Sequence, residues 1–377
     1  MPSFVSRFLL LLAVSGFSFS PAVAADDTIK IGEFASLTGK EATYGQAAHK
    51  GTLLAIEEIN AAGGVLGKKL ELIFEDDQSK PGEAATIAKK LISRDKVVAI
   101  LGEITSGRTL EAAPVAQNAR IPLVSPGATA PEVTARGDYI FRVCFVDSFQ
   151  GSVMAKFARQ SLKLKRVAVL SSASSAQSVG LARIFRQRFS ADGGVIALEQ
   201  KFSEGDKDFR AQLTSIRAAG VEGIFVPAYY SEAALICKQA RDLGVTVPLF
   251  GIDGWESTEL IAIGGAAVEG AYFSTHFSPE SNDPAVASFN ERFRRRWSAG
   301  TDALSALGYD SAQLLADAIR RAGTTESARL RDALAATKNF KGITGTISLD
   351  AQRNATKSAV VLQVKGGRFV FVERVDP

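Results

Sequence analysis

The sequence predicts an α/β fold built from two doubly wound parallel-sheet lobes. Short apolar runs alternate with amphipathic helical patterns along most of the chain, which is typical of parallel sheets covered by helices. This alternation occurs twice, with a change of pattern at residues 141–148 between the two passes. The chain also has 377 residues, which is more than one compact core usually holds.

Residues 1–25 have the pattern of a signal peptide. Arg7 precedes a mostly apolar run, and small residues follow it up to Ala24 and Ala25. The run is shorter than the roughly 20 apolar residues of a membrane-spanning helix. We therefore expect export to the periplasm with cleavage near Ala24 or Ala25. No cysteine stands at that point, which argues against a lipid anchor.

The composition is that of an ordinary globular protein. Hydrophobic residues make up 46% and charged residues 22%, with a net charge of +4. The densest basic run, 292–297, is expected to be a solvated helix face, so no nucleic-acid partner is predicted. Cys144 and Cys237 either pair or remain free in an oxidising compartment, and their wide separation favours two buried thiols.

The first pass of the alternation predicts a lobe with four strands. Glycines or acidic residues end the strands, and the helices have apolar residues at helical spacing. The expected strands are 28–32, 70–74, 97–101 and 121–125, and the expected helices are 44–60 and two that begin at 81 and 106.

The second pass predicts a lobe of the same kind. Its expected helices are 150–162, 179–190, 209–218 and 231–243, and its expected strands are 166–170, a strand ending at 202, 223–226 and 247–251. The chain then returns through a strand at 271–275 and helices at 285–297 and 305–321, and closes with short strands at 345–349, 359–364 and 368–374.

A first candidate site follows the buried strand 97–101. Gly102 allows a sharp turn, and Ser106 stands where the next helix begins. A helix start offers unpaired N–H groups and a partial positive charge, and strand ends in such sheets face the ligand crevice. Ser106 is therefore either part of a carboxylate cradle or simply the cap of its helix.

Polar residues also follow other strands. Thr129 ends a strand of the first lobe, while the loop 171–178, Tyr229 and Asp253 follow strands of the second. Thr129 and Asp253 are alternatively turn residues, and Tyr229 a packed aromatic. Trp255 either borders the ligand or covers the second lobe. Hydroxyls on one wall and an aromatic with a carboxylate on the other suit a zwitterion, with its ammonium paired by Asp253.

Four stretches, 29–32, 63–67, 125–137 and 306–310, together resemble the periplasmic leucine/isoleucine/valine-binding protein family. These proteins are the substrate-binding components of branched-chain amino acid ABC transporters. The resemblance runs from about residue 28 to about residue 372, and the stretch 125–137 is its most specific part.

The resemblance implies a type I periplasmic binding protein, whose lobes are joined by a three-segment hinge and close on a ligand. The N-terminal lobe is expected at 28–147 plus 277–357, and the C-terminal lobe at 148–276 plus 358–377. The implied ligand is an α-amino acid, branched-chain or otherwise apolar. A membrane permease is the implied partner, the protein is expected to be a monomer, and neither cofactor nor metal is expected.

The family's ligand contacts map onto both lobes. By position, Ser106 matches a carboxylate-binding serine. Gly127 and Thr129 match residues that contact both ends of the amino-acid backbone, and Ala128 between them belongs to the predicted site.

In the second lobe, Tyr229 matches a wall aromatic and Asp253 the acidic ammonium partner. Gln177 stands where the family often has a tyrosine, and Asp253 where it often has a glutamate. These departures predict a side-chain pocket that is wider or more polar, so that branched-chain specificity is not implied.

The sequence does not favour a catalytic function. His49 and His276 are the two candidate neutral-pH bases, and neither accompanies a G-x-S-x-G nucleophile turn. The stretch 63–69 fails the spacing of a phosphate loop, and no C-x-x-C or H-E-x-x-H pattern is present. The remaining alternatives are a ligand-sensing module of a signalling system, because the fold serves both uses, and a binder of a related amide or aromatic acid.

Overall fold

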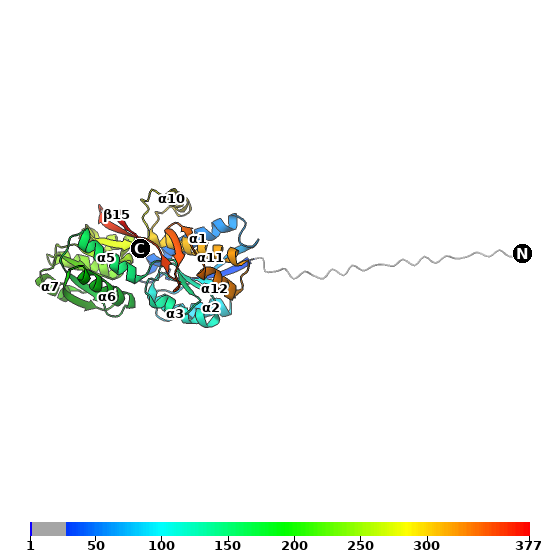
Figure 1. Cartoon of the computed structure of the whole chain (residues 1–377), viewed down its shortest axis with the longest axis horizontal. Coiled ribbons are helices and arrows are strands. Elements are labelled where there is room, and N and C mark those ends of the chain that lie inside the picture. The colour runs from blue at the N-terminus through cyan, green and yellow to red at the C-terminus, as the bar shows by residue number, and fades with distance from the viewer. Residues whose placement is uncertain (2–27) are drawn as a thin grey trace.

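The computed structural model describes Met1 and residues 28–377, so the predicted signal peptide lies outside the described residues except for Met1. Two large sheets, each with its own helices, occupy opposite ends of the molecule (Figure 1). We call the five-stranded sheet and its helices the first lobe, and the seven-stranded sheet and its helices the second lobe. The lobe boundaries inferred from the family resemblance stay a prediction.

The sheet of the first lobe is parallel throughout, as the sequence predicts. In sheet order its strands are β2 (Lys69–Asp76), β1 (Thr28–Ala35), β3 (Ala99–Leu101), β4 (Leu123–Ser125) and β5 (Ile140–Arg142). Its main helices are α1 (Ala42–Ala61), α2 (Glu83–Ser93), α3 (Ser106–Ala119), α11 (Ala303–Ala322) and α12 (Ser327–Ala335).

Alternation along the short central strands buries both faces of this sheet. In β3, Leu101 packs in the core shared with α1 and α11, whereas Ile100 packs in the core shared with α2 and α3. Successive strand residues point to opposite faces, so an uninterrupted apolar run is what a sheet covered on both sides requires.

The second lobe departs from the prediction at one edge. Its sheet order is β15-β14-β10-β9-β8-β6-β7, and β14 and β15 run antiparallel to their neighbours. Gly366 and Gly367 join them with φ values of 60° and 67°, which suits the tight turn of a hairpin. The parallel strands are β6 (Arg166–Ser172), β7 (Val195–Phe202), β8 (Gly223–Phe225), β9 (Leu249–Gly251) and β10 (Tyr272–Thr275), and the hairpin strands are β14 (Ala359–Lys365) and β15 (Arg368–Val375).

The helices of the second lobe follow the predicted order. They are α5 (Asp147–Gln160), α6 (Ala176–Ala191), α7 (Arg210–Ala218) and α8 (Tyr230–Asp242). The structure adds elements that the sequence patterns did not predict, namely β5, α4 (Glu132–Ala135), α9 (Thr258–Gly264), α12, the 3₁₀ helices η1 (Asp253–Trp255) and η2 (Gly265–Val268), and the strands β11 (Phe340–Gly342) and β13 (Ala355–Thr356), which pair with β12 (Gly345–Leu349). Most of these are too short for a periodic pattern.

Several open alternatives are resolved by packing. Trp255 is fully buried in the second lobe, where its Nε1–H donates to the Val226 carbonyl at 3.0 Å. It therefore covers that lobe's core. Cys144 and Cys237 are separate buried thiols, as the sequence favoured, and burial raises the pKa of each to about 12.

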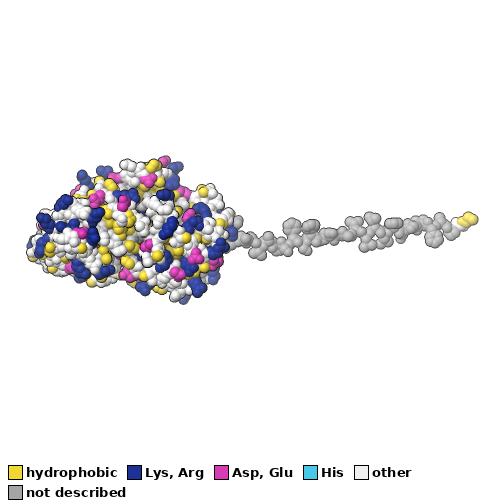
Figure 2. Space-filling model, viewed as in Figure 1, with side chains coloured by type: hydrophobic (Ala, Val, Ile, Leu, Met, Phe, Trp, Pro, Cys, Tyr) yellow, Lys and Arg dark blue, Asp and Glu magenta, His cyan; other side chains and the backbone are white. Residues whose placement is uncertain are grey.

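The basic run lies on α10 (Pro284–Trp297) and forms a solvated helix face as predicted, and it also makes ion pairs. Arg292 pairs with Glu58 at 3.0 Å and Arg296 with Glu57 at 2.9 Å, while Phe293 is buried. Acidic and basic side chains are interspersed over the face seen in Figure 2.

Among residues 28–377, every helix falls short of the combined length and apolarity that crossing a membrane demands.

The crossing of α1 and α11 depends on glycine. A Cβ placed on Gly308 would lie 2.2 Å from the Ala48 carbonyl oxygen, and one on Gly51 would lie 1.9 Å from the Ser305 carbonyl oxygen. Neither obstacle is a flexible side-chain end, so the helices must separate to admit even a methyl group.

Gly308→Ala is therefore expected to lower the free energy of unfolding by about 1–3 kcal/mol, because it overpacks a backbone contact. Gly180→Ala, in α6, is the matched control: nothing lies within 4 Å of its Cβ position, and alanine in a helix should add about 0.5–1 kcal/mol. Urea unfolding of both variants measures the difference. Equal effects of the same sign would contradict the close helix crossing.

Candidate functional site

A cavity of about 150 Å³ lies between the lobes. It brings together three of the predicted site residues, Ser106, Gln177 and Tyr229. Around it are the loop before α1, the start of α3, the start of α6, the end of β7 and the start of α8. The full lining is Glu41, Thr105, Ser106, Gly107, Arg108, Ser174, Ser175, Ala176, Gln177, Glu204 and Tyr229.

Ser106 does not cap its helix. The cap position of α3 is Thr105, and Ser106 is the first helical residue. Its Oγ accepts a hydrogen bond from the Ala130 N–H at 3.1 Å, which ties the helix start to the loop after β4. The free N–H groups of the first turn therefore open beside that loop.

The buried side chain of Arg142 fixes the loop 126–131. Its Nη1 donates to the Ala128 carbonyl at 2.6 Å and its Nη2 to the Ala130 carbonyl at 2.8 Å. The Ala128 carbonyl thus faces Arg142, while the backbone N–H of Ala128 donates to Ser125 Oγ. A Cβ on Gly127 would come within 2.9 Å of the Ile104 side chain, so the loop packs closely there.

Thr129 is the point where the two lobes meet in this loop. Its Oγ1 accepts a hydrogen bond of 2.6 Å from Gln177 Nε2 on α6, and both residues are buried. The polar replacement at position 177 therefore joins the lobes directly.

Asp253 lies deeper and does not line the cavity. Its Oδ1 accepts from Gln150 Nε2 at 2.9 Å and from the Gly254 N–H at 3.0 Å, and its Oδ2 lies 3.1 Å from His276 Nε2. Burial lowers the pKa of His276, so the ring is neutral and donates its Nε2–H. Both oxygens of the predicted ammonium partner already accept hydrogen bonds from the protein.

Asp147 is a second buried carboxylate that the sequence patterns missed. It is 1% exposed, its N–H donates to the Thr129 carbonyl at 3.0 Å, and neither carboxylate oxygen has a hydrogen-bond partner among the described residues. Burial raises the pKa of this carboxyl well above its ordinary value, the nearby Asp253 carboxylate raises it further, and the adjacent Thr129 side chain lowers it in part. Asp147 begins α5 after the short connection 143–146 from the end of β5, and strand ends are where such sheets bind ligands.

Three tyrosines close the gap between the lobes beside the cavity. The Tyr44 hydroxyl donates to the Gly254 carbonyl, and the Tyr230 hydroxyl donates to the Lys40 carbonyl at 2.6 Å. The Tyr229 ring packs edge-on against Tyr44 with centroids 5.7 Å apart. Tyr44 was not predicted, because nothing in the spacing of α1 marks one buried aromatic as different from its neighbours.

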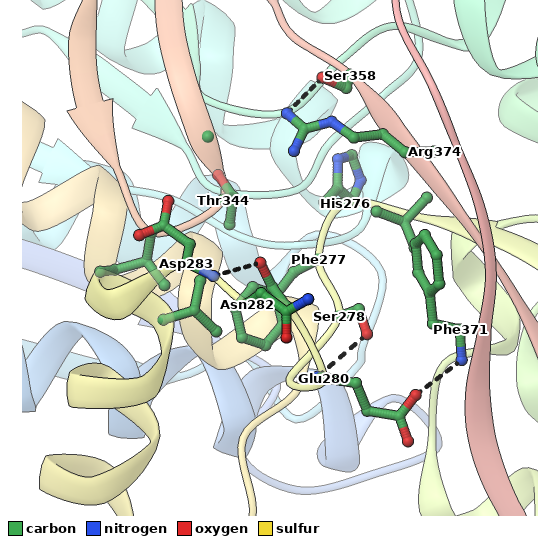
Figure 3. Close-up of a pocket in the computed structure, with 15 residues that line it drawn as sticks. His276, Phe277, Ser278, Glu280, Asn282, Asp283, Thr344, Ser358, Phe371 and Arg374 are labelled. Carbon is green, nitrogen blue, oxygen red and sulfur yellow. Dashed lines mark hydrogen bonds between the residues drawn. The ribbon is translucent and has the colours of Figure 1, made fainter.

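A second cavity, of about 260 Å³, lies where the loop after β10 meets the β14–β15 hairpin (Figure 3). Arg374 Nη2 donates to Ser358 Oγ at 2.7 Å, and the Phe371 N–H donates to Glu280 at 3.1 Å. Its lining includes His276 but none of the predicted ligand contacts.

Residues 28–377 contain no cluster of three or more His, Cys, Asp or Glu side chains arranged to hold a metal ion. His49 lies on α1, where it pairs with Glu33 at 2.5 Å and packs against Phe74. It is remote from the cavity lining.

Known proteins share this architecture. The family model described as periplasmic binding protein matches residues 28–368. A leucine-, isoleucine-, valine-, threonine- and alanine-binding protein of Pseudomonas aeruginosa is 32% identical over 347 residues, which cover 92% of this chain and 91% of the relative.

Two solved structures are similar over nearly their whole length. The leucine-binding protein LivK of Thermotoga maritima has a TM-score of 0.89 and 38% identity, with 93% of this chain and 99% of that chain covered. The branched-chain amino acid transporter substrate-binding protein LivJ of Streptococcus pneumoniae, solved with isoleucine, has a TM-score of 0.88 and 36% identity, with 93% and 100% covered. The chain belongs to the periplasmic binding protein family.

Proposed function

We propose that this protein captures an α-amino acid between its lobes and delivers it to the membrane permease of an ABC importer, without turnover. The observation that carries the proposal is the buried carboxyl group of Asp147 beside Thr129, in a loop that also reaches Ser106 through Ala130. The start of α3, which favours an anion, and the Asp147 carboxyl group, which favours a cation, thus lie on either side of Thr129. A zwitterionic ligand satisfies both.

The proposed roles follow from this placement. The ligand carboxylate accepts from Ser106 Oγ and from N–H groups of the first α3 turn, where an anion is stabilised by up to about 2 kcal/mol when partly buried. The ammonium donates to Thr129 and to the buried carboxylates Asp147 and Asp253. Tyr229 covers the ligand from the second lobe.

The remaining predicted contacts shape the loop and its cover. Gly127 lets the backbone of the loop approach the ligand, with Ala128 held by Arg142 behind it. Gln177 joins Thr129 across the gap. Because a ligand between the lobes makes contacts that an open form lacks, it shifts the population toward the closed form.

The cellular setting completes the proposal. The family is periplasmic, and the N-terminal pattern supports export with cleavage near Ala24 or Ala25. We propose a monomer with lobes at 28–147 plus 277–357 and 148–276 plus 358–377. The similarity to importer components over almost the whole chain favours transport over sensing.

A thermal-shift panel of the twenty amino acids, with amides, urea and aromatic acids added, tests the ligand class. We expect α-amino acids to raise the melting temperature, because ligand that binds only the folded state stabilises it. Isothermal titration then gives the stoichiometry, expected to be one. A response confined to compounds without an α-amino group would overturn the assignment.

Asp253→Ala tests the cation end of the site. Loss of a charged hydrogen bond, worth about 1.5–3 kcal/mol, should weaken α-amino acids about 10- to 100-fold. The matching carboxylic acids without the amino group should change little. Asp138→Ala, at a surface ion pair with Arg331, is the control. Equal losses for both ligand classes would argue against the ammonium contact.

The pH dependence of binding tests Asp147. Its carboxyl pKa is raised in the free protein, and an ammonium favours the ionised form, so binding should release a proton. Affinity should therefore rise with pH and level off once the raised pKa of Asp147 is passed. Calorimetry in buffers of different ionisation enthalpy measures this release. Asp147→Asn should abolish it, and an unchanged release in that variant would assign the proton elsewhere.

A further inference from the structure

The cavity between the lobes is polar where an aliphatic ligand side chain needs an apolar wall. Within the described part of the chain, Ala176 is the one aliphatic side chain in its lining, and the others carry hydroxyl, amide or charged groups or are glycine. A branched aliphatic side chain gains little from such a surface, because its stabilisation comes from apolar area removed from water.

Glu41 lines this cavity and has a side-chain oxygen that accepts no hydrogen bond from the described residues. Its side chain is 5% exposed, and Oε1 lies 3.2 Å from Lys40 Nζ. Oε2 is buried and has no hydrogen-bond partner in residues 28–377. Burial raises the pKa of the Glu41 carboxyl, in keeping with an oxygen that lacks a donor.

Arg108 lines the same cavity and has a side-chain N–H that donates to no described residue. Its side chain is 11% exposed, and Nη1 donates to Glu111 Oε1 at 2.7 Å. Its Nε–H is buried and makes no hydrogen bond to any described residue. Two side chains of the lining therefore each carry a buried polar atom without a partner among the described residues, an oxygen in Glu41 and an N–H in Arg108. Leaving either atom unpaired is costly.

We propose that the ligand side chain ends in a carboxamide, whose NH₂ donates to Glu41 and whose carbonyl accepts from Arg108. This inference rests on the proposed function, because it takes the α-amino acid head to lie at Ser106 and Thr129. The ligand class is then an amino acid of the asparagine or glutamine type.

Other side-chain chemistries fit the lining less well. A carboxylate would meet Glu41 and Glu204. A cation could pair with these two residues but would leave the Arg108 N–H without an acceptor, and an aliphatic group would leave both buried atoms unpaired. A site built to hydrogen-bond a polar group rejects analogues that lack it far more strongly than an apolar pocket rejects one methylene.

Isosteric ligands give the test. Asparagine, aspartate and leucine have nearly the same shape, and glutamine and glutamate extend the series by one methylene. Titration calorimetry should show asparagine or glutamine binding at least about 10-fold more tightly than leucine and than its own acid. Leucine binding as tightly as both amides would overturn the inference and leave the proposed function standing. Failure of every α-amino acid would instead overturn the proposed function.

Variants of Glu41 separate recognition from folding. Glu41→Leu should weaken the preferred amide about 10- to 100-fold and raise the relative affinity for leucine. Glu41→Gln, which keeps the size, should raise the melting temperature of the free protein because it removes a buried charge, and should still weaken the amide. Glu199→Gln, at an exposed pair with Arg186, is the control. An unchanged amide-to-leucine ratio in both Glu41 variants would contradict the contact.

Discussion

The guanidinium of Arg142 is the constraint on which the rest of the site depends. It is fully buried at the end of β5 and donates to two carbonyls of the loop that follows β4. A loop carrying adjacent polar groups would otherwise leave its carbonyls unpaired inside the protein. Because Arg142 pairs those on either side of Thr129, that residue presents its hydroxyl to the second lobe and its carbonyl to Asp147. The Arg142 side chain thereby orients both the hydroxyl and the carbonyl of Thr129.

The two buried acids beside this loop differ in what surrounds them. Asp253 accepts hydrogen bonds from Gln150, from Gly254 and from a neutral His276, so its position is fixed from three sides. Asp147 accepts none of these three hydrogen bonds. Its own N–H donates to the Thr129 carbonyl, and the Thr129 side chain lies near its carboxyl group. A nearby positive charge favours the ionised form of such a buried carboxyl group. The pair therefore combines one carboxylate that accepts three hydrogen bonds with one that accepts none of them.

Sequence patterns recover the long elements and their order, because helices such as α1 and strands such as β1 have enough residues to show a period. They miss β5, because the pattern changes at residues 141–148, and they also miss Asp147 at the start of α5. Ser106 and Thr129 could be placed at strand ends, but their partners could not be identified. The Tyr44–Gly254 contact spans 210 positions and the Thr129–Gln177 contact 48, and no local rule relates residues so far apart. The two hairpin strands β14 and β15 were predicted as strands, but their antiparallel direction in the sheet was not.

Two tyrosine hydroxyls form hydrogen bonds between the lobes in the protein without ligand. Tyr44 and Tyr230 each donate to a backbone carbonyl of the opposite lobe, and neither hydrogen bond requires a bound ligand. Hydrogen bonds of this kind stabilise the closed form relative to an open one, and they do so without ligand. A larger closed fraction in the ligand-free protein raises the apparent affinity for a ligand that binds the closed form.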